Sequence, residues 1–292
     1  LGVLTIDLVA FGWGFIAFTD ARLMTFTPPA LRWLQQEQPD EQPFRVTTYG
    51  TSDLLPPNSG MLAGVQDIRG YDSIIPRQYV ELWRLLEEPS GLRYNRLKGL
   101  TQPTTLASPL LDLMNVKYIL TTQPIQQAGF TRVYEGEVFI YRNEEVLPRA
   151  FAVFEARPAA DQAQARKLVA EPGFDPRRTV VLEAYTAPRT SGTTTARMQA
   201  ADILRYEPNR VVARVRMPQE GYLVLSDAYF PGWRARDQQG RDIPVLRADA
   251  NFRAVPLGPG DHTVTFTYFP DSFKLGLYVS FLGAVVCLLT AG

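Results

Sequence analysis

The chain has 292 residues, with 30 Lys or Arg, 30 Asp or Glu, one His and one Cys, so its formal net charge is zero. This balance argues against the broad positive field of nucleic-acid-binding proteins, and we expect no nucleic-acid partner. One His and one Cys exclude an internal disulfide and a zinc site built from several such ligands, and we expect neither a metal nor a cofactor. At roughly 100 to 200 residues per domain, the length predicts two domains.

Both ends of the chain are apolar. Residues 1–18 contain Asp7 as their only charged side chain, and residues 275–292 contain none. Because about 20 apolar residues span a bilayer, we predict truncated transmembrane helices at 1–19 and 273–292. Asp7 would then have to face a helix bundle or a polar cavity, which predicts that the chain is a piece of a longer polytopic protein. The alternatives are buried core helices, or a signal peptide at the start.

Residues 20–150 are predicted to form a mixed α+β unit. Tyr79, Leu82, Trp83 and Leu86 recur at helical spacing after a proline, which predicts a helix over 76–88. Glu135-Gly136-Glu137 between two short apolar runs is typical of a hairpin. The other predicted elements are helices at 28–36 and 110–114 and strands at 44–49, 116–120, 132–134 and 138–142.

Residues 151–178 are predicted to hold a polar helix at 161–170 and a linker, and residues 179–272 a β-sandwich. Val211, Ala213, Val215 and Met217 alternate with polar neighbours, which is the pattern of a half-buried strand. Further short strands are predicted at 222–226, 233–236, 243–247, 252–257 and 263–268, separated by Gly and Pro turns. This spacing is typical of an antiparallel sandwich, so the predicted fold class is α+β with two flanking transmembrane helices.

The glycine-rich segment 60–73 combines side chains that bind sugars or phosphates. Asp67, Arg69, Tyr71 and Asp72 are its candidate ligand-binding residues. The segment lacks the Gly-Lys-Ser/Thr end of a phosphate-binding P-loop. The alternative interpretation is structural, with Asp67 and Arg69 paired to brace the loop.

A second candidate pair, Tyr229 and Trp233, flanks a Pro-Gly turn, and aromatic faces there would stack on sugar rings. The alternative is that a Trp after such a turn packs on the sandwich core. His262 fits a turn or a partly buried position better than catalysis. The sandwich strands also carry many arginines, which favours a solvated strand face, with anionic polymers or lipid headgroups as the alternative explanation. These arginines are residues 210, 214, 216, 234, 236, 241, 247 and 253.

Several motifs occur in an order that resembles the YfhO family of bacterial polytopic membrane proteins. They are DIRGYDS at 67–73, LMNVKYIL at 113–120, YFPGW at 229–233 and GDHTV at 260–264, followed by a last apolar helix. The resemblance runs over essentially the whole chain, as the C-terminal extracytoplasmic region of the family with its flanking helices.

This resemblance implies a multi-pass cell-membrane glycosyltransferase that moves sugar from a polyprenyl-phosphate carrier to a cell-envelope polymer such as teichoic acid. The implied partners are the lipid bilayer, the polyprenyl-phosphate sugar and an anionic envelope polymer. In that class the catalytic carboxylate lies in an early outward loop, upstream of this chain. We therefore predict no catalytic residue here and an accessory role for this region.

Two other functions stay open from the residues alone. One is a membrane-anchored carbohydrate- or polymer-binding module without catalytic activity, based on Tyr229, Trp233 and the arginine-rich strands. The other is a hydrolase that uses Asp67 and Asp72, whose separation is not fixed by the sequence.

Overall fold

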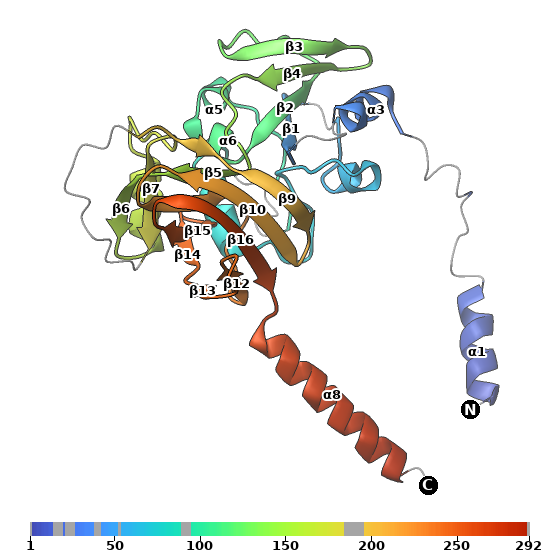
Figure 1. The fold of residues 1–292 in the computed structure, drawn as a ribbon. Helices are drawn as coiled ribbons and strands as arrows, with labels where there is room; N and C mark the ends of the chain where they lie inside the picture. Colours follow the sequence, from blue (N-terminus) through green and yellow to red (C-terminus); the bar gives the residue numbers. More distant parts are fainter. Residues whose placement is uncertain are drawn as a thin grey trace.

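The computed structural model describes residues 2–13, 20, 27–37, 42–51, 54–88, 95–183 and 196–290. The described strands form three sheets in a body from which one long helix projects (Figure 1). Helices and strands both contribute to this body, which confirms the predicted α+β class.

The first sheet has four strands in the order β1-β2-β4-β3: β1 (Arg45–Tyr49), β2 (Val116–Thr121), β3 (Phe130–Glu135) and β4 (Phe139–Asn143). β1 and β2 are parallel, whereas β3 and β4 form the predicted hairpin. The crossover between β1 and β2 carries η1 (Ser59–Ala63), α4 (Arg77–Trp83), α5 (Pro103–Leu106) and α6 (Pro109–Leu113). The helix α3 (Pro29–Gln36) covers this sheet, and its Leu34 belongs to one apolar cluster with Val46 and Tyr118.

The second and third sheets pack face to face as a sandwich. The seven-stranded sheet follows the order β6-β7-β14-β15-β11-β5-β8 and the five-stranded sheet the order β13-β12-β16-β10-β9. Alternate side chains of β10, such as Val211 and Val215, lie in the core between the sheets with Leu223 and Phe266. The predicted alternation therefore supplies the inner face of the sandwich.

The bounds of the sandwich strands are β5 (Ala150–Val153), β6 (Glu155–Ala159), β7 (Thr179–Glu183), β8 (Gln199–Ala200), β9 (Asp202–Glu207), β10 (Arg210–Met217), β11 (Gly221–Leu225), β12 (Trp233–Arg236), β13 (Asp242–Ile243), β14 (Leu246–Ala248), β15 (Phe252–Leu257) and β16 (Gly260–Tyr268).

The outer face of the seven-stranded sheet is buried as well. Phe151 and Val224 on this sheet share one apolar core with Trp83 and Leu111 of the crossover helices. The helix α7 (Gln162–Val169) adds to the same core, and its N-terminus is capped by Asp161, whose carboxylate accepts from the Gln164 backbone N–H at 2.8 Å. The core therefore crosses residues 150 and 178, where domain boundaries were predicted, and those boundaries stay a prediction.

The last helix, α8 (Asp271–Thr290), has no buried side chain. Most of its 20 residues are apolar, with Asp271 and Lys274 in the first turn, and at 1.5 Å per residue the helix extends about 30 Å, the thickness of a hydrocarbon core. Among the described residues it is the one helix long and apolar enough to span a membrane. The helix α1 (Gly2–Trp13) is also apolar but has only 12 residues, and 14–19 of the first predicted span lie outside the described residues.

Four details differ from the sequence-based expectation. The helix predicted over 76–88 ends at Trp83. The strand predicted over 243–247 is divided between two sheets, because Pro244 lacks the N–H that a continuous strand needs. The β6–β7 pair is parallel within an otherwise antiparallel sandwich, since α7 connects the two strands as a crossover. Finally, Arg253 is 2% exposed and does not belong to a solvated strand face.

Candidate functional site

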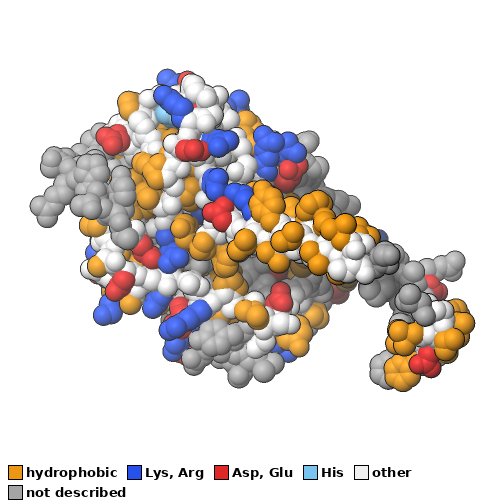
Figure 2. Space-filling view, turned by 90° about the horizontal axis from the view of Figure 1, so that it is seen from below, with side chains coloured by type: hydrophobic (Ala, Val, Ile, Leu, Met, Phe, Trp, Pro, Cys, Tyr) orange, Lys and Arg blue, Asp and Glu red, His pale blue; other side chains and the backbone are white. Residues whose placement is uncertain are grey.

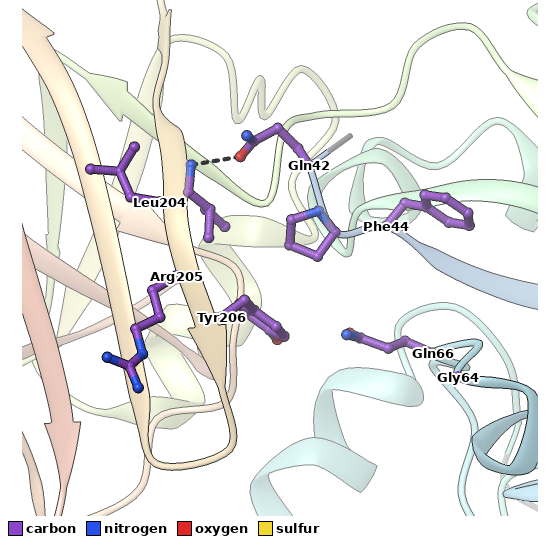
Figure 3. A pocket seen from close by; sticks show the side chains of 9 residues that line it. Gln42, Phe44, Gly64, Gln66, Leu204, Arg205 and Tyr206 are labelled. Atoms are coloured by element: carbon purple, nitrogen blue, oxygen red, sulfur yellow. Dashed lines mark hydrogen bonds between the residues drawn. The ribbon is translucent and has the colours of Figure 1, made fainter. Parts of the chain in front are cut away.

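Two adjoining cavities meet at Gly64 and Gln66, and the smaller of them lies beside strand β9. One encloses about 270 Å³ between residues 42–44 and β9, and Figure 3 shows Tyr206 and Gln66 pointing toward each other across it. The Gln42 side chain closes one side by accepting from the Ile203 backbone N–H at 2.6 Å. The other cavity encloses about 400 Å³. The two share Gly64 and Gln66 in their walls.

Six of the nine residues that line the larger cavity have polar or charged side chains. Its walls are formed by Arg45, Asn58, Met61, Gly64, Val65, Gln66, Asp67, Arg69 and Arg149.

Behind this wall lies the arginine cluster, which we define as Arg45, Arg149 and Arg253 around Asp227. Arg45 Nη2 and Arg253 Nη2 each lie 3.0 Å from a different oxygen of Asp227. Arg149 Nε lies 2.9 Å from Asp227 Oδ1, an ion pair without hydrogen-bond geometry. The side chains of Arg149 and Arg253 are 2% exposed, and that of Asp227 is 11% exposed. Three guanidinium groups therefore share one carboxylate in a nearly closed space.

Strand pairing brings these four residues together. Asp227 follows β11, which pairs with β5 on one side and with β15 on the other. Arg149 immediately precedes β5 and Arg253 lies in β15, directly opposite Leu225. Arg45 reaches the cluster from β1 and donates to the Ser226 carbonyl at 2.7 Å. The cluster is therefore the junction between the first sheet and the sandwich.

Neutral groups complete the coordination of Arg149. Its Nη2 donates at 2.5 Å both to Gln66 Oε1 and to the Tyr206 hydroxyl. The same hydroxyl donates to Asp227 Oδ1 at 3.0 Å. Arg149 Nη1 donates to Asn115 Oδ1 at 3.3 Å. Gln66 and Tyr206 thus connect the cluster directly to the two cavities.

The electrostatics of the cluster favour a net positive charge. Burial raises the pKa of Asp227, but Arg149, Arg45 and Arg253 outweigh burial and hold that pKa below its usual value. Burial lowers the pKa of Arg45 and Arg253 to about 10, so both remain protonated at neutral pH. Three positive charges facing one negative charge leave an excess of two.

Arg253 is the least satisfied member of the cluster. Its Nε and Nη1 are buried and have no hydrogen-bond partner within the described part of the chain. The guanidinium lies 3.6 Å from the ring centroid of Trp233 and 5.8 Å from that of Phe266. Cation–π contact therefore replaces part of the missing hydrogen bonding.

The predicted residues Asp67 and Arg69 form an ion pair of their own, apart from the arginine cluster, and the Arg69 guanidinium has further hydrogen-bond partners. Arg69 Nη2 lies 2.6 Å from Asp67 Oδ2, and the Arg69 backbone N–H donates to Oδ1 at 2.8 Å. The same guanidinium donates to Thr48 Oγ1 at 2.8 Å and to the Leu55 carbonyl at 2.6 Å. Burial raises the pKa of Asp67, and Arg69 offsets this only in part. The structure thus contains the loop-bracing pair that the sequence offered as the alternative to a ligand site.

Tyr71 and Asp72 are exposed and lie elsewhere. They line another cavity, of about 500 Å³, together with Ser73 and Asn95. Asp67 and Asp72 therefore contribute to different cavities, and Arg69 engages both oxygens of Asp67. A role for Tyr71 or Asp72 in binding stays a prediction.

The predicted aromatic residues Tyr229 and Trp233 both face arginines. The Arg247 guanidinium lies 4.7 Å from the Tyr229 ring centroid, and Arg253 lies over Trp233. Trp233 also packs against Tyr268, with ring centroids 5.2 Å apart. Trp233 is thus connected to the arginine cluster, whereas stacking of either ring on a sugar stays a prediction.

Sequence reasoning did not find the cluster. It placed Arg253 on a solvated face and did not single out Arg149 or Tyr206. One local signal was present, because Arg149 directly precedes the apolar run of β5 and Arg253 lies inside another apolar run. An arginine at such a position is rarely buried unless it is paired.

Comparison with known proteins locates a family match in the second half of the chain. Residues 188–280 match the family model described as bacterial membrane protein YfhO. A protein of Bacillus subtilis (strain 168), described as uncharacterized protein YfhO, is 24% identical over 90 residues, which are 31% of this chain and 10% of that protein. The chain thus spans about a tenth of the length of this curated relative.

Among solved structures, the chain is similar to the arabinofuranosyltransferase AftD from Mycobacteria. That similarity has 22% identity and a TM-score of 0.23, and it covers 26% of this chain and 6% of the AftD chain.

The family match is narrower than the resemblance read from the sequence. It contains the YFPGW and GDHTV motifs, whereas the motifs at 67–73 and 113–120 lie outside the matched residues. Asp227, Trp233 and Arg253 lie inside the match, and Arg45 and Arg149 lie outside it. The resemblance to the YfhO family of bacterial membrane proteins is therefore confirmed, and it is confirmed over residues 188–280.

Proposed function

We propose that the chain is a non-catalytic extracytoplasmic domain of a polytopic membrane glycosyltransferase. In this proposal the parent enzyme transfers sugar from a polyprenyl-phosphate carrier to a cell-envelope polymer such as teichoic acid, and this domain positions the polymer or braces the membrane core. The YfhO match supports the membrane location, and the apolar helix α8 supplies an attachment.

The observation that carries the proposal is the close packing at the junction between the sandwich and α8. Gly232 has φ of 111°, and a Cβ built on it would lie 2.8 Å from Pro270 Cβ, just before α8 begins. The Phe269 backbone N–H donates to the Gly232 carbonyl at 3.2 Å. Glycine at 232 is therefore required both for the backbone angle and for the close approach.

Charged side chains also meet at this junction. Asp271 Oδ1 lies 3.2 Å from Arg234 Nη2 on β12 and 2.8 Å from Lys274 Nζ in the first turn of α8. Figure 2 shows hydrophobic side chains covering α8, with charged side chains on the body around its start. This change from charged to apolar surface is what a helix has where it enters a bilayer.

Aromatic rings lie at the same level. Phe269 and Phe273 have ring centroids 5.8 Å apart, and Lys274 Nζ lies 5.1 Å from the Phe269 centroid. Aromatic and basic side chains at the start of a spanning helix favour the membrane–water interface. We infer that the body stands on the membrane surface in a set orientation, as a domain that positions a substrate would.

Two glycine variants of the full-length membrane protein test the proposal. Gly232→Ala should lower sugar incorporation into envelope polymer, because the added Cβ displaces Pro270 and with it the body. Gly240→Ala is the matched control, since Gly240 also has positive φ, 78°, but a Cβ there meets no atom within 4 Å. Equal incorporation by both variants and by the wild type would contradict a positioning role.

The alternative, a membrane-anchored carbohydrate-binding module, places the same body on the membrane without transfer chemistry. It predicts that the chain binds neutral glycans through Tyr229 and Trp233. Glycan-array binding in detergent, with Trp233→Ala as the control, separates the two functions.

A further inference from the structure

The larger of the two adjoining cavities is lined by positively charged side chains without their counter-ion. Arg45 and Arg149 belong to its wall. Asp227 pairs with both of them but is not one of the described residues that line the cavity. The other ionic groups of this wall, Asp67 and Arg69, neutralise each other at 2.6 Å. The field inside the cavity is therefore set by the arginine cluster and its excess of two positive charges.

Such an excess is costly in a nearly closed space. Neighbouring guanidinium groups repel each other, and burial removes the water that would screen them. Burial lowers the pKa of Arg45 most, and repulsion from Arg149 is the next largest effect on it. Burial also lowers the pKa of Arg253 most, and there the raising effect of Asp227 is larger than the lowering effect of Arg149 or of Arg45. An anion in the cavity would offset this repulsion without any rearrangement of Asp227.

The remaining groups of the cavity fit a ligand larger than a simple ion. Gln66 accepts from Arg149 through Oε1, which leaves its amide nitrogen as a donor beside the guanidinium groups. The adjoining cavity adds Phe44 and Tyr206 to the wall. Cavities of about 400 and 270 Å³ that share a wall are together of the size that holds a small organic ligand.

We propose that this pair of cavities binds a phosphate ester, with Arg45, Arg149 and Gln66 donating to the phosphate oxygens and the esterified polyol or sugar lying beside Phe44 and Tyr206. Planar guanidinium groups match the oxygens of a phosphate, and a phosphate monoester carries about the charge that the cluster has in excess. This site goes beyond the proposed function, because it does not depend on glycosyl transfer by the parent enzyme.

Gln66→Glu is the most informative variant. The introduced carboxylate keeps an acceptor for Arg149 and opposes an anionic ligand, so the fold should be retained while binding is lost. Gln127→Glu, in the exposed loop before β3, makes the same charge change away from the cavity and serves as the control. Arg149→Met tests the wall directly, but it also removes a buried cation.

The experiment uses the full chain in phosphatidylcholine nanodiscs, with sn-glycerol 3-phosphate, inorganic phosphate and glucuronate as probes. We expect glycerol 3-phosphate to raise the melting temperature of the wild type and of Gln127→Glu, and Gln66→Glu to bind it at least about tenfold more weakly. The melting temperature without ligand shows that each variant is folded.

A second set of nanodiscs that also contains phosphatidic acid identifies the source of the phosphate. Stabilisation by soluble glycerol 3-phosphate supports a ligand from solution, and stabilisation by phosphatidic acid alone, lost in Gln66→Glu, supports a lipid headgroup in the same site. Equal stabilisation by glucuronate, equal binding by Gln66→Glu and the wild type, or no response to any phosphate ester would overturn the proposal.

Discussion

Asp67 and Asp227 are both buried carboxylates held by arginine, and they differ in how many guanidinium groups surround them. Asp67 has one, Arg69, and burial still raises its pKa. Asp227 has three, and together they lower its pKa despite burial. One guanidinium thus forms a structural pair whose net charge is zero. Three guanidinium groups keep the carboxylate ionised and give the cluster a net positive charge, which an anionic ligand would neutralise.

A third carboxylate extends the comparison to one that pairs with no guanidinium in the described ranges of the chain. Asp249 is 1% exposed and accepts from the Val181 backbone N–H at 2.8 Å. Burial raises its pKa from 3.8 to about 7, and this hydrogen bond offsets burial only in part. Buried carboxylates with zero, one and three cations therefore occur in one molecule.

The largest effect is expected from Asp227→Asn. This change leaves three buried guanidinium groups without a counter-ion, and breaking a buried ion pair from one side costs about 5 kcal/mol at the upper end. Denaturant unfolding of the full chain in detergent, followed by tryptophan fluorescence, measures it. Asp242→Asn removes an exposed partner of Arg236 and serves as the control, with no measurable change expected. Equal stability of the two variants would show that the cluster does not depend on Asp227.

The second effect is a pH dependence assigned to Asp249. Because its pKa is higher in the folded than in the unfolded chain, the unfolded state loses the proton first, and stability falls as the pH rises from about 4 to about 7. The full change is about 4 kcal/mol for a shift of this size. Asp249→Asn keeps an acceptor for Val181 and suits the positive φ of 47°. In the variant, the free energy of unfolding should no longer fall between about pH 4 and pH 7 by this amount. If the wild type and the variant showed the same slope of unfolding free energy against pH, the pH dependence would belong to other groups.

Asp67→Asn should cost less than Asp227→Asn, about 3 kcal/mol in the same unfolding measurement, because only one guanidinium loses its counter-ion. Arg69 retains its bonds to Thr48 and Leu55, and the asparagine still accepts from the Arg69 backbone N–H. A cost equal to or larger than that of Asp227→Asn would mean that the number of cations does not set the penalty.

The strands were predictable from the sequence where one face of the strand is exposed to solvent. β10 alternates between buried and exposed side chains, and the sequence indicates it directly. β5 is buried at every position, and a four-residue apolar run has no periodicity to read. Arg253 was misplaced for the same reason, because β15 is also buried at nearly every position and its apolar run has no alternation that would show Arg253 to be buried.

The Asp67 and Asp227 sites also differ in how well the sequence predicts them. Asp67 and Arg69 are two residues apart, so their pairing is a local property that the sequence analysis considered. The arginine cluster joins Arg45, Arg149 and Arg253 to Asp227 across separations of 26 to 182 residues. Arg149 and Arg253 meet Asp227 because β11 pairs with both β5 and β15, and Arg45 reaches it from β1 of another sheet; no local pattern encodes these pairings.

The smallest effect concerns the aromatic ring over the cluster. Trp233→Leu removes the cation–π contact with Arg253 and keeps an apolar side chain. It should lower the free energy of unfolding, measured by denaturant unfolding of the full chain in detergent, by about 2 kcal/mol. Tyr229→Leu is the matched control, because its contact with Arg247 is longer, at 4.7 Å, and lies outside the cluster. In the Asp227→Asn background, the cost of Trp233→Leu should rise, since Arg253 then has no carboxylate and depends more on the ring. An unchanged cost would mean that Trp233 contributes packing alone, and the third guanidinium would then be held by Asp227 without help from the indole.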